Sequence, residues 1–216
     1  MSVVAVVFDM DGVLVDSEPV WERVRRAYVA DRGGQWKDDT QRRLMGMSTK
    51  EWSEYLSGEL GVDASPETVA REVIEQMAAH YDRELPLLPG AVAAVRRISA
   101  RWPLAVASSS PRALIDVVLR DADLVDSFTV TLSTEEVQHG KPSPEVYLAA
   151  AEALGHGPES CAAVEDSSNG IRAAHGAGLL VIGIPSSDYP LDSDAATMVT
   201  HTITSLDQLT PELIEG

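Results

Sequence analysis

The chain has 216 residues, of which 44% are hydrophobic and 24% charged, an ordinary globular composition that argues against a disordered, collagenous or fibrous protein. Its 17 lysines and arginines face 34 acidic residues, so the formal net charge is −17 and binding to a nucleic-acid backbone is not expected. The single cysteine, Cys161, excludes an internal disulfide and a multi-cysteine zinc site.

No apolar run reaches the roughly 18 residues that a membrane-spanning helix needs, so no membrane partner is expected. The apolar stretch at residues 3–8 is too short for a signal peptide, and no basic region precedes it. We therefore expect a cytoplasmic protein, with a monomer as the default state.

Short apolar, β-branched segments predict the strands of a parallel sheet that is buried on both faces. In chain order, they lie at residues 3–8, 104–107, 128–132, 161–164, 179–184 and, more weakly, 197–203. Helical patterns separate most of them, at residues 91–99, 111–120, 144–154 and 169–176. This alternation predicts an α/β fold with a doubly wound, mostly parallel sheet.

Residues 17–84 interrupt the alternation, because they contain no convincing strand. Helical patterns are expected there at residues 17–30, 41–45, 49–60 and 66–81. A helical block inserted after the first strand of an α/β domain is typical of a lid or cap. We therefore expect two domains, a core made of residues 1–16 and 85–216 and a helical cap made of residues 17–84.

Two pairs of carboxylates follow predicted strands. Asp9 and Asp11 come after the first strand, with Gly12 behind them, and Glu165 and Asp166 end a later strand in the same way. Acids at the mouth of a buried strand are costly unless a cation or a partner compensates them, which favours a catalytic or metal-binding role. The alternatives are a polar strand end with a turn and, for Asp166, a helix N-cap.

A serine run and a lysine are expected near these acids. Ser108 and Ser109 follow the strand at residues 104–107, and Lys141 lies between Gly140 and Pro142. Taken singly, the serines are typical of a helix cap, and a lone lysine is typical of a solvated surface. Ligands of parallel sheets bind at the carboxyl ends of the strands, so these side chains together predict one site.

The acids and the lysine suit a particular chemistry. Asp9, Asp11 and Asp166 supply hard oxygens, which are the ligands that Mg²⁺ prefers. With Lys141 and Ser108 beside it, Mg²⁺ would suit a phosphoryl group. The sequence therefore predicts a magnesium-dependent site for a small phosphate ester.

The motifs resemble, in order, the four motifs of the haloacid dehalogenase (HAD) superfamily. The segment Asp9-Met10-Asp11-Gly12-Val13 resembles the first, Ser108 the second, Lys141 the third and Glu165-Asp166 the fourth. The resemblance covers essentially the whole chain, and residues 17–84 resemble a helical cap of the first type. Within the superfamily, the chain is most similar to subfamily IA, and especially to hexose-phosphate phosphatases of the 2-deoxyglucose-6-phosphate type and to β-phosphoglucomutases.

The resemblance implies a role for each residue. Asp9 would attack phosphorus and form an aspartyl-phosphate, and Asp11 would protonate the leaving alcohol and then activate water. The residues implied to hold Mg²⁺ are Asp9, Asp11 (through its backbone carbonyl), Asp166 and, directly or from behind, Glu165. Those implied to hold the phosphate oxygens are Ser108, Ser109 and Lys141.

The resemblance implies a magnesium-dependent phosphatase of sugar or polyol phosphates, and a β-phosphoglucomutase-like phosphomutase is the alternative. The mutase carries a histidine where this chain has Trp21, and a cap arginine that grips the distal phosphate where it has Thr49. Asp11 disfavours dehalogenation, since the dehalogenases lack this acid, and the complete acid set disfavours a non-catalytic binding protein. Trp21 and Trp52 either line the cap pocket or pack in its core, the latter being commoner for aromatic residues on amphipathic helices.

Overall fold

The computed structural model describes residues 2–44, 47–186, 188 and 190–215. In this part of the chain, six strands form one sheet in the order β3-β2-β1-β4-β5-β6, and every neighbouring pair is parallel. The strands are β1 (Ala5–Phe8), β2 (Leu104–Ser108), β3 (Val130–Ser133), β4 (Cys161–Glu165), β5 (Leu180–Gly183) and β6 (His201–Thr202). The predicted parallel sheet is confirmed.

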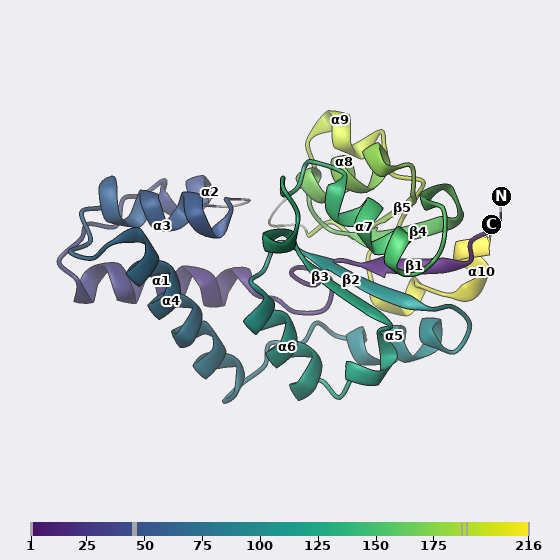
Figure 1. The fold of residues 1–216 in the computed structure, drawn as a ribbon, viewed down its shortest axis with the longest axis horizontal. Coiled ribbons are helices and arrows are strands. Elements are labelled where there is room, and N and C mark those ends of the chain that lie inside the picture. Colours follow the sequence, from purple (N-terminus) through teal and green to yellow (C-terminus); the bar gives the residue numbers. More distant parts are fainter. Residues whose placement is uncertain (1, 45–46, 187, 189, 216) are drawn as a thin grey trace.

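Helices cover both faces of this sheet (Figure 1). The described helices that come after residue 90 are α5 (Ala91–Ser99), α6 (Arg112–Asp121), α7 (Glu145–Ala153), α8 (Ser168–Ala177), α9 (Ser193–Ala196) and α10 (Pro211–Glu215). Val6 and Phe8 of β1 face α5 and α6, whereas Ala5 and Val7 face α7 and α8. Successive side chains of a strand point to opposite faces, so burial on both sides explains the unbroken apolar run.

Four of the described helices follow β1 in the chain and lie at the left of Figure 1, to one side of the sheet; together they are called the helical insert. Its helices are α1 (Glu18–Asp31), α2 (Thr40–Leu44), α3 (Thr49–Gly58) and α4 (Pro66–Tyr81). The helix expected at 41–45 ends on Met45, which lies outside the described residues. None of the described helices is both long and apolar enough to cross a membrane.

The two chain segments that join the insert to the sheet run side by side. The Asp16 N–H donates to the Pro86 carbonyl at 2.8 Å, and the Leu88 N–H donates to the Leu14 carbonyl at 2.9 Å. The outgoing segment follows β1 after a tight loop. The insert is therefore attached beside the carboxyl end of β1, where the first predicted acids lie.

The end of the chain differs most from the sequence prediction. The strand expected at residues 197–203 is reduced to His201 and Thr202, which pair only with β5 at the edge of the sheet. The short helices α9 and α10 lie outside the segments that the sequence predicts as helical.

Candidate active site

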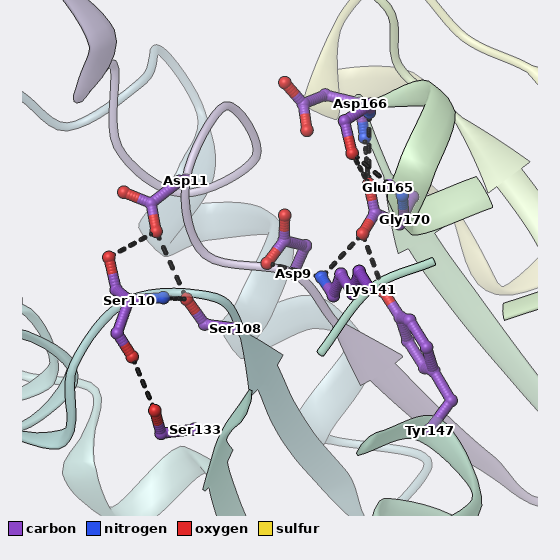
Figure 2. Close-up of polar contacts among 11 residues, drawn as sticks. Asp9, Asp11, Ser108, Ser110, Ser133, Lys141, Tyr147, Glu165, Asp166 and Gly170 are labelled. Atoms are coloured by element: carbon purple, nitrogen blue, oxygen red, sulfur yellow. Dashed lines mark hydrogen bonds and ion pairs between the residues drawn. The ribbon is translucent and has the colours of Figure 1, made fainter. Parts of the chain in front are cut away.

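The predicted site residues gather at the carboxyl ends of three neighbouring strands (Figure 2). Asp9 directly follows β1, Ser108 is the last residue of β2, and Glu165 is the last residue of β4. β1 lies between β2 and β4 in the sheet, so the three strand ends are adjacent at one edge. This placement agrees with the rule that ligands of parallel sheets bind at the carboxyl ends of the strands.

Lys141 links two of these strand ends. Its Nζ lies 3.0 Å from Asp9 Oδ1 and 2.7 Å from Glu165 Oε1, and its side chain is only 5% exposed. Burial alone would lower the pKa of Lys141, but the carboxylates of Asp9 and Glu165 outweigh it and raise this pKa. Lys141 is therefore a fixed, buried positive charge beside Asp9 and not a solvated surface lysine.

Glu165 is fully buried, and both of its carboxylate oxygens have partners. Oε1 accepts hydrogen bonds from Lys141 and from the Tyr147 hydroxyl at 2.9 Å. Oε2 accepts from the backbone N–H groups of Asp166 and Ser167 at 3.0 and 3.1 Å. Glu165 thus orients both Lys141 and the loop that carries Asp166. This arrangement favours the predicted role in which Glu165 supports the metal ligands without binding the metal itself.

Asp9, Glu165 and Asp166 form a carboxylate cluster in which one oxygen of each lies within 4.8 Å of the others. Burial raises the pKa of Asp9 to about 8; Lys141 opposes this shift, whereas Glu165 and Asp11 add to it. Burial and Glu165 also raise the pKa of Asp166 well above its ordinary value. Three crowded carboxylates beside one lysine fit a divalent cation with hard oxygen ligands. The Asp11 carboxylate is not part of this cluster.

Asp11 points instead toward the serine loop after β2. Its Oδ2 accepts hydrogen bonds from Ser110 Oγ at 2.7 Å and Ser108 Oγ at 3.1 Å, whereas its buried Oδ1 has no partner among the described residues. Ser133 Oγ donates to the Ser110 carbonyl at 2.8 Å and braces the loop. Ser109 is exposed on the cavity wall. Ser110 belongs to the serine run at residues 108–110, whose hydroxyls the sequence offers for an anion, but its contact with Asp11 was not among the predictions.

Two glycines allow the acids to approach so closely. Gly12 has φ +73°, and a Cβ at this position would overlap the Asp166 carboxylate. Gly170, in the first turn of α8, lies against the Glu165 carboxylate, which a Cβ would also overlap. Both positions therefore exclude any larger residue unless an acid of the site moves.

A Gly170→Ala substitution is expected to lower the free energy of unfolding by about 1–3 kcal/mol, because it forces the hydrogen-bonded Glu165 out of place. Gly176→Ala is the matched control in the same helix, since its Cβ would meet only Pro144 Cβ at 3.8 Å. There, alanine is expected to raise the free energy of unfolding by up to about 1 kcal/mol. Urea denaturation measures both, and equal effects of the two substitutions would contradict this account of Gly170.

A cavity of about 730 Å³ opens between these acids and the helical insert. The insert contributes Trp21, Arg25 and Trp52 to its wall, and all three side chains are nearly buried. Trp21 and Trp52 therefore line the cavity and also pack in the hydrophobic core, so both predicted roles apply. Thr49 of the insert also contacts the segment that follows β3, because its Oγ1 donates a hydrogen bond to Glu135 Oε1 at 2.8 Å.

Residues 3–178 match the haloacid dehalogenase-like hydrolase family. The phosphorylated carbohydrates phosphatase of Thermotoga maritima is 36% identical over 176 residues, covering 81% of this chain and 82% of the relative. Hexitol phosphatase B of Escherichia coli is 33% identical over 220 residues, covering 99% and 97%.

Solved structures also match the chain over nearly its whole length. CbbY from Rhodobacter sphaeroides in complex with phosphate matches with a TM-score of 0.83 and 27% identity, covering 96% of each chain. A β-phosphoglucomutase from Clostridium difficile has a TM-score of 0.81, covering 98% of this chain and 95% of its own, but at 23% identity it shows a likeness of fold alone. The protein is thus an enzyme that belongs to the haloacid dehalogenase-like hydrolase family.

Proposed function

We propose that the protein is a Mg²⁺-dependent phosphatase of small phosphorylated metabolites, namely sugar or polyol phosphates, and that it acts through an aspartyl-phosphate. The observation that carries this proposal is the pairing of Asp9 with the buried Lys141, with an unpartnered oxygen of Asp11 nearby. The relatives named as carbohydrate and hexitol phosphatases support the choice of substrate class.

In the first step, a carboxylate oxygen of Asp9 attacks phosphorus while the bond to the leaving oxygen breaks. The Asp11 carboxyl group gives a proton to that oxygen, so that an alcohol leaves and Asp9 carries the phosphoryl group. In the second step, Asp11 takes a proton from a water molecule that attacks phosphorus. The Asp9–phosphate bond breaks, and inorganic phosphate and the free carboxylate are released.

The phosphoryl oxygens need positive charge and hydrogen-bond donors around them. In the proposal, Lys141 supplies the charge, and Ser108 and Ser109 supply donors from the loop after β2. Mg²⁺, held by Asp9, Asp166 and the backbone of Asp11, would neutralise further charge on the phosphoryl group when bound. Lys141 is already oriented for its part by Glu165, which lies 2.7 Å from its Nζ.

The test is phosphate release from a panel of sugar and polyol phosphates, measured with Mg²⁺ and with EDTA. We expect release that falls at least about 100-fold in EDTA, because a bound cation contributes several kcal/mol to phosphoryl transfer. Release that is unaffected by EDTA contradicts the proposed metal site.

The same panel tests the mutase alternative, through glucose 1-phosphate with and without glucose 1,6-bisphosphate. A mutase must hold a second phosphate, and the residue at the position of the mutase arginine, Thr49, is uncharged and hydrogen-bonded to Glu135. We therefore expect free phosphate and no bisphosphate-dependent isomerisation. Formation of glucose 6-phosphate without release of phosphate would make the protein a mutase.

A further inference from the structure

Arg25 is a buried cation that the chemistry above does not use. It lies on α1 of the helical insert, is 5% exposed, and lines the same cavity as Asp9 and Asp11. With the described residues it forms no ion pair closer than 4.0 Å, and its Nε is shielded from solvent without a hydrogen-bond partner. Burying an arginine is costly unless its charge and donors are satisfied, so an unpartnered arginine in a cavity wall favours a polar ligand beside it.

Two indole rings hold the guanidinium in place. Its Cζ lies 4.3 Å from the Trp21 ring centroid and 5.0 Å from that of Trp52. Such cation–π contacts stabilise the charge through the ring faces but accept no conventional hydrogen bond. The guanidinium carries five N–H donors in one plane, so the edge of Arg25 stays available to the cavity.

Glu18 provides an acceptor on the same wall. It precedes Arg25 by seven residues, which is about two helical turns, so both side chains lie on one face of α1. One Glu18 oxygen accepts from Gln41 Nε2 at 2.7 Å. The carboxylates of Glu18 and Asp11 both act on the Arg25 charge, yet both remain beyond ion-pair distance. A donor and an acceptor thus face the cavity with a gap between them.

We propose that Arg25 and Glu18 form a subsite for hydroxyl groups of the leaving alcohol, so that the enzyme selects polyhydroxylated phosphate esters; this inference rests on the proposed function. A hydroxyl group accepts a hydrogen bond from Arg25 and donates one to Glu18 at the same time. A second phosphate or a carboxylate would accept from Arg25 but would be repelled by Glu18 and Asp11. The subsite therefore favours a neutral sugar or polyol over a second anion.

The experiment compares kcat/KM for sorbitol 6-phosphate with that for acetyl phosphate, which has no hydroxyl group. We expect Arg25→Met to lower this ratio about 10- to 100-fold, mainly through the KM for sorbitol 6-phosphate, because a hydrogen bond to a charged group is lost. Arg26→Met is the matched control, since Arg26 is the next residue of α1 and its side chain is 65% exposed. It is expected to leave both constants unchanged.

A second variant separates hydroxyl binding from anion binding. Glu18→Gln is expected to lower the preference for sorbitol 6-phosphate over glucose 1,6-bisphosphate, because it removes the charge that repels the second phosphate. If Arg25→Met instead impairs the bisphosphate more than sorbitol 6-phosphate, Arg25 binds an anion and the proposal is wrong. If Arg25→Met lowers kcat/KM equally for sorbitol 6-phosphate and acetyl phosphate, Arg25 has only a structural role and the proposal is wrong.

Two further measurements keep the result interpretable. If Arg25→Met does not fold, Arg25→Lys replaces it, because lysine keeps the charge but lacks the planar guanidinium. It is expected to lower the ratio of kcat/KM for sorbitol 6-phosphate to that for acetyl phosphate by an intermediate factor. Calorimetric titration of wild type and Arg25→Met with sorbitol 6-phosphate in EDTA, where hydrolysis is suppressed, measures the affinity for this ester. No phosphate release from any ester would overturn the proposed function, whereas equal affinity of the two proteins for sorbitol 6-phosphate would overturn the subsite alone.

Discussion

An Asp9→Asn variant is expected to lose on the order of 10⁴-fold or more in kcat, because the amide can neither attack phosphorus nor carry the phosphoryl group. Asparagine has nearly the shape of aspartate, so the side chain can remain between Lys141 and the carboxyl end of β1. The measurement is steady-state phosphate release with Mg²⁺ at saturating substrate. Asp126→Asn, at an exposed position that precedes β3 and so lies away from the carboxyl ends of the strands, is the control and should match wild type. Turnover within tenfold of wild type would exclude Asp9 as the nucleophile.

Stability measurements show whether this loss is chemical. Burial raises the pKa of Asp9 from 3.8 to about 8, so the folded protein disfavours its ionised form. A raised carboxyl pKa means that wild type loses stability as the pH rises from about 4 to about 8. Asparagine does not titrate. In EDTA, the free energy of unfolding of Asp9→Asn, relative to that of wild type, should therefore increase as the pH rises from about 4 to about 8. The variant is expected to be folded but inactive.

A Lys141→Met substitution is expected to lower the free energy of unfolding by about 3–5 kcal/mol at neutral pH, besides abolishing activity. It removes the only cation within 4.0 Å of Asp9 and Glu165 among the described residues, which lie 3.0 and 2.7 Å from the lysine Nζ. The two buried acidic side chains are then left without a cation. Urea denaturation in EDTA measures the loss.

The control for this prediction is Lys50→Met, because the Lys50 side chain is 83% exposed. It should change the free energy of unfolding by no more than about 0.5 kcal/mol. Without Lys141, nothing opposes the effect of burial on the pKa of Asp9, so lowering the pH should restore part of the lost stability. A Lys141→Met protein as stable as wild type at pH 8 would show that the lysine does not compensate these acids.

Much of the fold could be predicted because burial leaves a direct pattern in the sequence. The run that forms β1 is apolar at every position, as expected for a strand that is covered on both faces. The helix predicted at residues 91–99 agrees with α5 at both ends, and the strand ends place Asp9, Ser108 and Glu165 next to their predicted elements. The family was also recognisable from these motifs, since their order and residue types depend on the chemistry of the site.

The contacts between these elements were decided by the tertiary structure. Nothing near Asp11 in the sequence indicates that Ser110 holds its carboxylate, because the two residues are 99 positions apart. Likewise, Tyr147 reaches Glu165 across 18 positions, and Arg25 reaches the Trp52 ring from another helix. Hydrophobic periodicity determines which faces are buried, but only side-chain packing determines which polar groups meet there. The sheet, the helices of the insert and the set of acids could thus be predicted from the order of residues, whereas side-chain packing between distant segments holds the acids in place and buries Arg25 in the cavity wall.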